Sequence, residues 1–311
     1  MSSLSNRNPL DTLFNVFKTV PPALTSGLAL FMVILFFASV AFPTMNESLA
    51  LNSRLLTNFE LNRLTWYPML HLNLLHLGLN LWAFVPLLSS FELSNGTVRT
   101  GVVLNVLATL TGLAYALIGL VFFPDASVLG SSAWVFSFMG YFTYLEQSAM
   151  PTTSITGNFK IPTWTKPFIV LIVTAIILPG SSFLGHLLGL VFGFLLAMGK
   201  LKFMVEPPGK VILWIEKRID FLIKLIQQKF YYVKEADAIE IRKGESQSIP
   251  LHAVGPSGSG AGAGSRPAAA AASASPKKSG NPFQGQGNVL GNTDSNWSQI
   301  SSPKSFFFFF F

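Results

Sequence analysis

The sequence predicts an all-α polytopic membrane protein with six transmembrane helices. Half of its 311 residues are hydrophobic, and its mean hydropathy is +0.49. Charged residues make up 11% of the chain, whereas soluble domains carry about 25%. Most of the six apolar segments approach the ~20 residues that a helix needs to cross hydrocarbon. These segments are Ala23–Phe42, Thr65–Leu88, Thr100–Phe123, Val128–Leu145, Pro167–Gly180 and Ser182–Gly199.

The distribution of charge predicts the orientation in the membrane. Residues 1–22 are a short polar leader without a small-residue cleavage site, which we interpret as a cytosolic tail before an uncleaved anchor. Six crossings place both termini on one side. From Lys200 onward there are 14 lysines and arginines against 8 acidic residues, so the positive-inside rule predicts that both termini are cytosolic. No nucleic-acid-reading motif accompanies this basic excess, and a nucleic-acid partner is not expected.

The segments outside the membrane carry three further signals. Residues 45–66 are expected to form a lumenal or extracellular loop, where Asn46 begins an Asn-Glu-Ser sequon and is a glycosylation candidate. Residues 207–233 predict a cytosolic amphipathic helix that lies on the bilayer interface, because isoleucines recur at three- and four-residue steps between lysines. Residues 245–311 are expected to be disordered, because Gly255–Gly280 is rich in Gly, Ser, Ala and Pro.

Two apolar segments each begin near a residue that suits nucleophilic catalysis. A histidine within hydrocarbon is costly and indicates function, and a serine needs such a base to become a nucleophile. Ser132 precedes Glu146 by 14 residues, and His186 precedes Lys200 by 14. At ~1.5 Å per helical residue, both side chains are expected about 21 Å from the cytosolic boundary. Because no buried carboxylate is available to complete a triad, the pair is expected to act as a dyad.

Other polar and aromatic residues are expected to surround this pair. His76 and Asn80 lie one helical turn apart in the second segment, where they could donate hydrogen bonds to an oxyanion. The backbone N–H of Ser132 at a helix start could add a third donor. Phe136 lies four residues after Ser132, so its ring could stack on the imidazole of His186.

Less specific interpretations of the same residues remain open at this stage. Taken singly, each is more often a helix-packing residue. A metal site is disfavoured, because His71 and His76 are five residues apart and no HExxH motif exists; no cofactor is expected. His71 is expected to lie at the membrane interface. A transporter is disfavoured because internal repeats and intramembrane carboxylates are absent from the sequence.

Together these motifs resemble the signatures of rhomboid intramembrane serine proteases. The resemblance covers residues 23–200 and implies a six-helix rhomboid protease domain. The matching residues are Gly130, Ser131, Ser132 and Gly140; His71, His76 and Asn80; and Gly185, His186, Gly189 and Gly193. The resemblance implies Ser132 as nucleophile, His186 as base, His76 and Asn80 as oxyanion donors, and Gly130, Phe136 and Gly189 as supporting residues. Two positions depart from the family pattern, Ala133 instead of glycine and Phe136 instead of tyrosine.

The nearest resemblance is to the fungal Golgi rhomboid, through Thr65–Pro68, Gly96–Thr97 and Pro179–Phe183. It implies a Golgi or endoplasmic reticulum membrane protein that cleaves transmembrane proteins near the lumenal face, membrane-tethered sterol-regulatory-type transcription factors among them. The alternative is a derlin-like pseudoprotease that dislocates membrane proteins without cutting them. The presence of both Ser132 and His186 favours the protease.

The C-terminal tail carries a separate motif at Phe283–Gly291. It resembles the FxGxGxx-hydrophobic-G (SHP) box, which docks on the valosin-containing AAA ATPase. The alternative is an ordinary glycine-rich linker. That alternative does not account for two apolar anchors in a polar tract, and extended segments with spaced anchors are a common docking mode. The motif residues are Phe283, Gly285, Gly287, Leu290 and Gly291.

Overall fold

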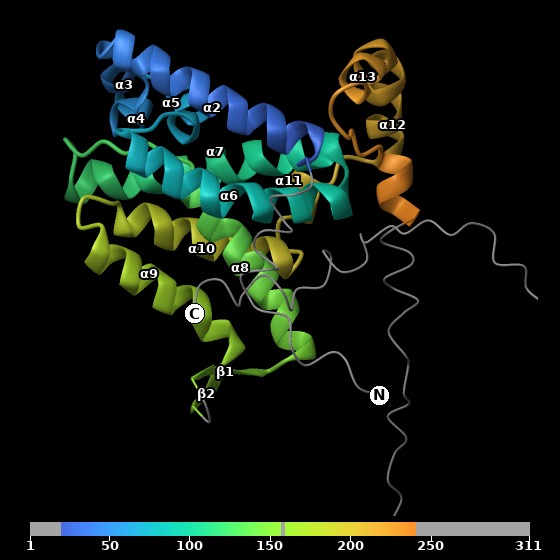
Figure 1. Ribbon diagram of the computed structural model, residues 1–311. Helices are drawn as coiled ribbons and strands as arrows, with labels where there is room; N and C mark the ends of the chain where they lie inside the picture. Colours follow the sequence, from blue (N-terminus) through green and yellow to red (C-terminus); the bar gives the residue numbers. More distant parts are fainter. Residues whose placement is uncertain (1–19, 157–158, 241–311) are drawn as a thin grey trace, which may run out of the picture.

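The computed structural model describes residues 20–156 and 159–240 (Figure 1). The expected ATPase-binding box at residues 283–291 and most of the N-terminal leader lie outside the described residues. Within the described part, the chain is a bundle of α-helices. This architecture confirms the all-α polytopic fold that the composition predicts. The bundle helices are α2 (Ala23–Ala41), α6 (Leu74–Asn95), α7 (Thr97–Phe122), α8 (Ser132–Ala149), α9 (Lys166–Ile177) and α10 (Phe183–Ala197).

Each apolar segment corresponds to one of these helices, with one large shift in boundaries. By length and composition, α2, α6 and α7 are each sufficient to cross a membrane; α10 qualifies together with the bent stretch that follows it. Helix α6 begins at Leu74, nine residues later than the apolar segment at Thr65. Pro68 lies in a short 3₁₀ helix, and the Asn73 side chain accepts a hydrogen bond from the His76 N–H, which caps α6 there.

The segment between α2 and α6 is a compact layer of short helices rather than an extended loop. Leu55 and Tyr67 from this layer are buried, and the Tyr67 hydroxyl donates to the carbonyl of Ala108 in α7. The layer therefore packs on the same end of the bundle at which α8 and α10 begin (Figure 1). Its elements are α3 (Thr44–Leu49), α4 (Arg54–Thr57), α5 (Asn62–Trp66) and η1 (Tyr67–Met69).

Helix α8 is the most buried of the bundle helices. Its Trp134 ring stacks on Phe84 of α6 at 5.6 Å, and its indole N–H donates to the Leu104 carbonyl of α7. A Cβ added at Gly193 of α10 would overlap the carbonyl oxygen of Ser137. The glycine spacing thus allows the backbones of α8 and α10 to come into direct contact, which is a packing mode of membrane helices.

A β-hairpin that the sequence did not predict connects α8 to α9. Strand β1 (Thr152–Thr156) pairs antiparallel with β2 (Phe159–Pro162), and η2 (Thr163–Thr165) leads into α9. At this end of the bundle, Lys166 and Glu146 form a buried ion pair with a 2.9 Å N–O distance. These two charges, which border the fourth and fifth apolar segments, therefore lie within α8 and α9 and are paired there, as burial requires.

The region expected as one amphipathic helix is divided in the structure. Within the expected residues 207–233 the structure has two helices, α12 (Gly209–Arg218) and α13 (Asp220–Gln227), with Ile219 between them; the short helix α11 (Lys202–Val205) precedes this region. In Figure 1, α12 and α13 (orange) lie beside the end of the bundle at which α2 begins.

Candidate active site

The first turns of three helices, α6, α8 and α10, supply the residues of the site. His76 is the third residue of α6, Ser132 is the first of α8, and His186 is the fourth of α10. Side-chain caps fix two of these starts. Asn73 caps α6, and the Ser182 hydroxyl accepts a 3.1 Å hydrogen bond from the Gly185 N–H at the start of α10. The site is therefore assembled from the ends of rigid elements.

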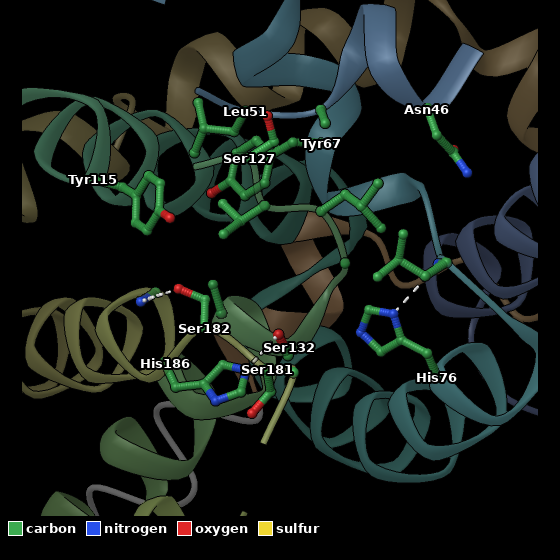
Figure 2. A pocket seen from close by; sticks show the side chains of 18 of the residues that line it. Asn46, Leu51, Tyr67, His76, Tyr115, Ser127, Ser132, Ser181, Ser182 and His186 are labelled. Carbon is green, nitrogen blue, oxygen red and sulfur yellow. Dashed lines mark hydrogen bonds between the residues drawn. The ribbon is translucent and has the colours of Figure 1, made fainter. Parts of the chain in front are cut away.

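Ser132 and His186 lie in hydrogen-bonding contact. The Ser132 Oγ is 2.8 Å from the His186 Nε2 (Figure 2). The imidazole of His186 is almost fully buried, and its ring stacks on that of Phe136 with centroids 4.6 Å apart. The position of Phe136 four residues after Ser132 accounts for this stack. Burial and stacking hold the imidazole in one orientation toward the hydroxyl.

Glycines allow the chain to reach this geometry. Gly130 has a φ of 123°, which side-chain-bearing residues rarely adopt, and a Cβ there would lie 2.8 Å from the His76 ring. It therefore makes the turn into α8 and leaves room for His76. On the other side, a Cβ at Gly189 would overlap the Ala133 carbonyl oxygen. The close approach that brings His186 to Ser132 depends on this glycine.

The expected oxyanion donors are not placed equally. His76 lines the cavity beside Ser132, whereas Asn80 is buried one turn deeper, and its amide N–H donates to the His76 carbonyl at 2.8 Å. The first N–H groups of α8, like those of any helix, have no intrahelical acceptors, and the side chain of the N-cap residue Ser131 does not cap them. Ser132 and Ala133 at this helix start line the same cavity as His76.

The layer of short helices braces the segment that precedes Ser132. Leu51 and Val128 exchange two backbone hydrogen bonds of 2.8 and 2.9 Å, and the Gly130 N–H donates to the Tyr67 carbonyl at 2.8 Å. Arg63, which is buried, ties the layer together by donating to the Glu47 carbonyl at 3.1 Å. The sequence pattern did not single out Arg63, because the same loop also carries Glu47, Arg54 and Glu60.

Arg63 also hydrogen-bonds the side chain of Glu60 within this layer. This bond lowers the pKa of the Glu60 carboxyl below its usual range. The shift means that the arginine favours the charged form of this carboxyl, as expected for an ion pair.

A cavity of about 900 Å³ opens beside Ser132 and is lined by His76 and His186 (Figure 2). Its walls come from the starts of α6, α8 and α10, from the short-helix layer, and from the turn before α10. Asn46, the glycosylation candidate, lies in α3 and lines the cavity from the opposite side. The volume is sufficient for several side chains of an extended peptide.

His71, which was expected at the membrane interface, is fully buried within the protein. Its ring contacts that of His76 edge-on at 5.2 Å, and its Nε2 lies 3.4 Å from the Ser131 Oγ. The sequence analysis placed residues 71 and 76 on one helix, with their side chains pointing apart. The helix begins only at Leu74, so the two rings can meet. Among the described residues, no three metal-ligating side chains cluster.

The fold and this serine–histidine site define the class of the protein. A Rhomboid domain model matches residues 58–203, from the short-helix layer through α11. The Rhomboid-type serine protease 2 of Yarrowia lipolytica is 48% identical over 223 residues, which cover 71% of this chain and 75% of the relative. The chain belongs to the rhomboid family and is an intramembrane serine protease.

Other fungal relatives extend the similarity. The Rhomboid-type serine protease 2 of Debaryomyces hansenii is 38% identical over 302 residues, which cover 94% of this chain and 99% of the relative. The protein of the same name from Saccharomyces cerevisiae is 36% identical over 239 residues, covering 75% of this chain and 91% of the relative.

Proposed function

We propose that the protein cleaves transmembrane substrates with a catalytic dyad of Ser132 and His186. The observation that carries this proposal is the 2.8 Å contact between the Ser132 Oγ and the His186 Nε2 at the wall of the cavity. A hydrogen bond of this length lets the imidazole take the hydroxyl proton as the nucleophile attacks. No carboxylate contacts His186 among the described residues, and Phe136 supports the ring by stacking.

The chemistry follows in two balanced steps. The Ser132 Oγ bonds to the scissile carbonyl carbon while His186 takes its proton; the carbon–nitrogen bond then breaks as the same proton passes to the leaving amine. A water molecule next loses a proton to His186 as its oxygen bonds to the acyl carbon. The bond from that carbon to the Ser132 Oγ breaks, His186 returns the proton to the Oγ, and the carboxylic acid leaves. The tetrahedral oxyanion of each step would be stabilised by His76, by Asn80 and by the N–H groups at the start of α8.

The proposed substrates are single-pass membrane proteins, including membrane-tethered transcription factors of the sterol-regulatory type, cut near the lumenal face. The proposed location is the Golgi or endoplasmic reticulum membrane, with both termini cytosolic. The direct test is incubation of the purified protein with a model transmembrane substrate. A fragment cut near the lumenal end supports the proposal, whereas an intact substrate favours the derlin-like alternative.

Removal of the oxyanion donors should separate turnover from nucleophile reactivity. We expect His76→Ala to lower kcat by about 10²-fold, because one oxyanion donor is worth a few kcal/mol. Asn80→Ala should cost less than His76→Ala, because Asn80 lies deeper and donates to its own helix. A fluorophosphonate probe should still label Ser132 in Asn80→Ala. Unchanged turnover in the double variant would show that both residues serve packing alone.

The tail is proposed to recruit the valosin-containing AAA ATPase through Phe283–Gly291. Phe283 and Leu290 would fill apolar pockets, and the glycines would let the backbone lie close to the partner. We expect Phe283→Ala to abolish co-purification of the ATPase from solubilised membranes, with cleavage of a short substrate unchanged. Asn288→Ala, between the anchors, is the matched control. Full recovery of the ATPase with a Phe283, Leu290 double variant would mean that the tract is only a linker.

A further inference from the structure

The chain changes direction sharply after the last bundle helix. The stretch Lys202–Arg218, which contains α11 and α12, makes an angle of 91° with α10. Because α10 corresponds to the sixth expected membrane crossing, a helical stretch perpendicular to it is expected to run parallel to the membrane surface. In Figure 1, α12 and α13 lie next to the ends of α2 and α7 rather than along their sides. This geometry places the pair at the level of the leaflet boundary.

The segment that follows α13 fixes the pair to the bundle. We refer to residues 231–238 as the docking segment. The Tyr231 carbonyl accepts a 2.9 Å hydrogen bond from the N–H of Ala23, the first residue of α2. The Val233 carbonyl accepts from the N–H of Thr97, the first residue of α7, and the Val233 N–H donates to the Thr97 hydroxyl at 3.0 Å. The docking segment thus joins two membrane helices.

Ionic and apolar contacts complete this attachment. Glu235 of the docking segment forms an ion pair with Arg99 of α7, with a 2.7 Å N–O distance and both side chains largely buried. Its N–H donates to the Glu216 carboxylate of α12 at 3.0 Å. Ile212 of α12 and Ile223 of α13 are buried at 0% and 1% exposure. Because these contacts hold one face of α12 and α13, the outward face has a defined direction.

That outward face is apolar and exposed. Phe221 is 77% exposed, Trp214 59%, Leu225 54% and Leu222 51%. In α13, Leu225 lies three residues after Leu222 and four after Phe221, and spacings of three and four residues place side chains on the same side of a helix. Soluble surfaces rarely expose aromatic and aliphatic side chains of this size together, and such a face indicates an interaction surface.

Basic side chains accompany this apolar face. Arg218 lies over the Trp214 ring, 5.3 Å from its centroid. The acidic residues of α12 and α13 are already engaged, since Glu216 faces the docking segment and Asp220 pairs with Lys224 at 2.7 Å. The exposed charge is therefore positive, which suits the anionic phospholipids of a cytosolic leaflet. The basic residues of residues 209–230 are Lys210, Lys217, Arg218, Lys224 and Lys229.

We propose that α12 and α13 form an interfacial anchor that inserts Trp214, Phe221 and Leu225 into an anionic leaflet. The docking segment holds this anchor at a fixed angle to α2 and α7. A helix that lies in the headgroup region has an apolar face, basic side chains beside that face, and an axis parallel to the bilayer. The anchor is independent of the catalytic dyad, so the proposal can be tested without measuring proteolytic activity.

The chain contains no cysteine, which allows single-cysteine labelling of the full-length protein. Phe221→Cys and Gln227→Cys would be reconstituted in bilayers of equimolar phosphatidylcholine and phosphatidylserine. Gln227 is the matched control, because it is exposed on the same helix but lies on the opposite side from the apolar face. We expect a membrane-impermeant maleimide to label Phe221→Cys about tenfold more slowly than Gln227→Cys, because lipid covers residue 221.

The contribution of charge is tested by changing the lipid and the protein separately. In phosphatidylcholine alone, the protection of residue 221 should weaken. Lys217→Gln or Lys229→Gln should weaken it about fivefold in the anionic bilayer. Equal labelling at residues 221 and 227 in anionic bilayers would overturn the proposal. So would protection that is the same in neutral lipid, or protection that arises only after a cytosolic extract is added, which would indicate a protein partner.

Discussion

Replacement of either Ser132 or His186 by alanine is expected to reduce cleavage of a transmembrane substrate below detection. Each residue depends on the other, because the hydroxyl is a weak nucleophile without its base and the imidazole has no function without the hydroxyl. In a serine hydrolase such a loss is about 10⁵-fold or more. The double variant should be no worse than either single variant, since the residues act as one unit. The measurement is the rate of product formation by the purified proteins in detergent.

The control for this experiment is another serine of the same cavity. Ser181 lines the cavity, but it has no histidine within hydrogen-bonding distance. Ser181→Ala should therefore retain cleavage and fluorophosphonate labelling, whereas Ser132→Ala and His186→Ala should lose both. Cleavage that persists in Ser132→Ala would contradict the proposed dyad. Loss in all three variants would point to unfolding, which thermal denaturation of each purified variant distinguishes.

The helices that carry the site could be predicted because membrane helices have a strong and simple signal. Hydrophobic length predicted α2, α7, α8 and α10 to within a few residues of their observed ends. The start of α6 was predicted too early, because residues 65–73 contain no charged residue and continue the apolar segment without a break. The decisive signals were local: a proline in η1, which has no backbone N–H, and the asparagine that caps α6. Hydropathy does not detect either of them.

The tertiary contacts of the site were predictable only in part. Counting residues back from the cytosolic charges predicted that Ser132 and His186 lie at the same depth, and the two side chains do meet. Depth alone does not say which side chains share a face. The contact of the buried His71 ring with His76, for example, was not predicted. The bracing of the Ser132 turn by Leu51 and Tyr67 joins distant parts of the chain, and no local pattern predicts it.

The close contact between α8 and α10 leads to the second large expected effect. Gly189 and Gly193 of α10 face the backbone of α8, where an added Cβ would overlap the carbonyl oxygens of Ala133 and Ser137. Backbone atoms in the centre of a helix cannot move aside locally as the end of a side chain can. An alanine at either position must therefore push the two helices apart. Overpacking of this kind typically costs 1–3 kcal/mol.

Gly189→Ala is expected to lower cleavage by about 10²-fold or more, because it also separates the proposed base from the nucleophile. His186 lies one turn before Gly189 on α10, so a shift of that helix lengthens the 2.8 Å contact with Ser132. A displacement of about 1 Å in a catalytic geometry can cost 10²-fold in rate. Gly78→Ala is the matched control, because Gly78 is also helical but a Cβ there meets nothing within 4 Å. Thermal unfolding and cleavage measured on both variants decide the matter: if Gly189→Ala matches Gly78→Ala in both, the contact between α8 and α10 does not position His186.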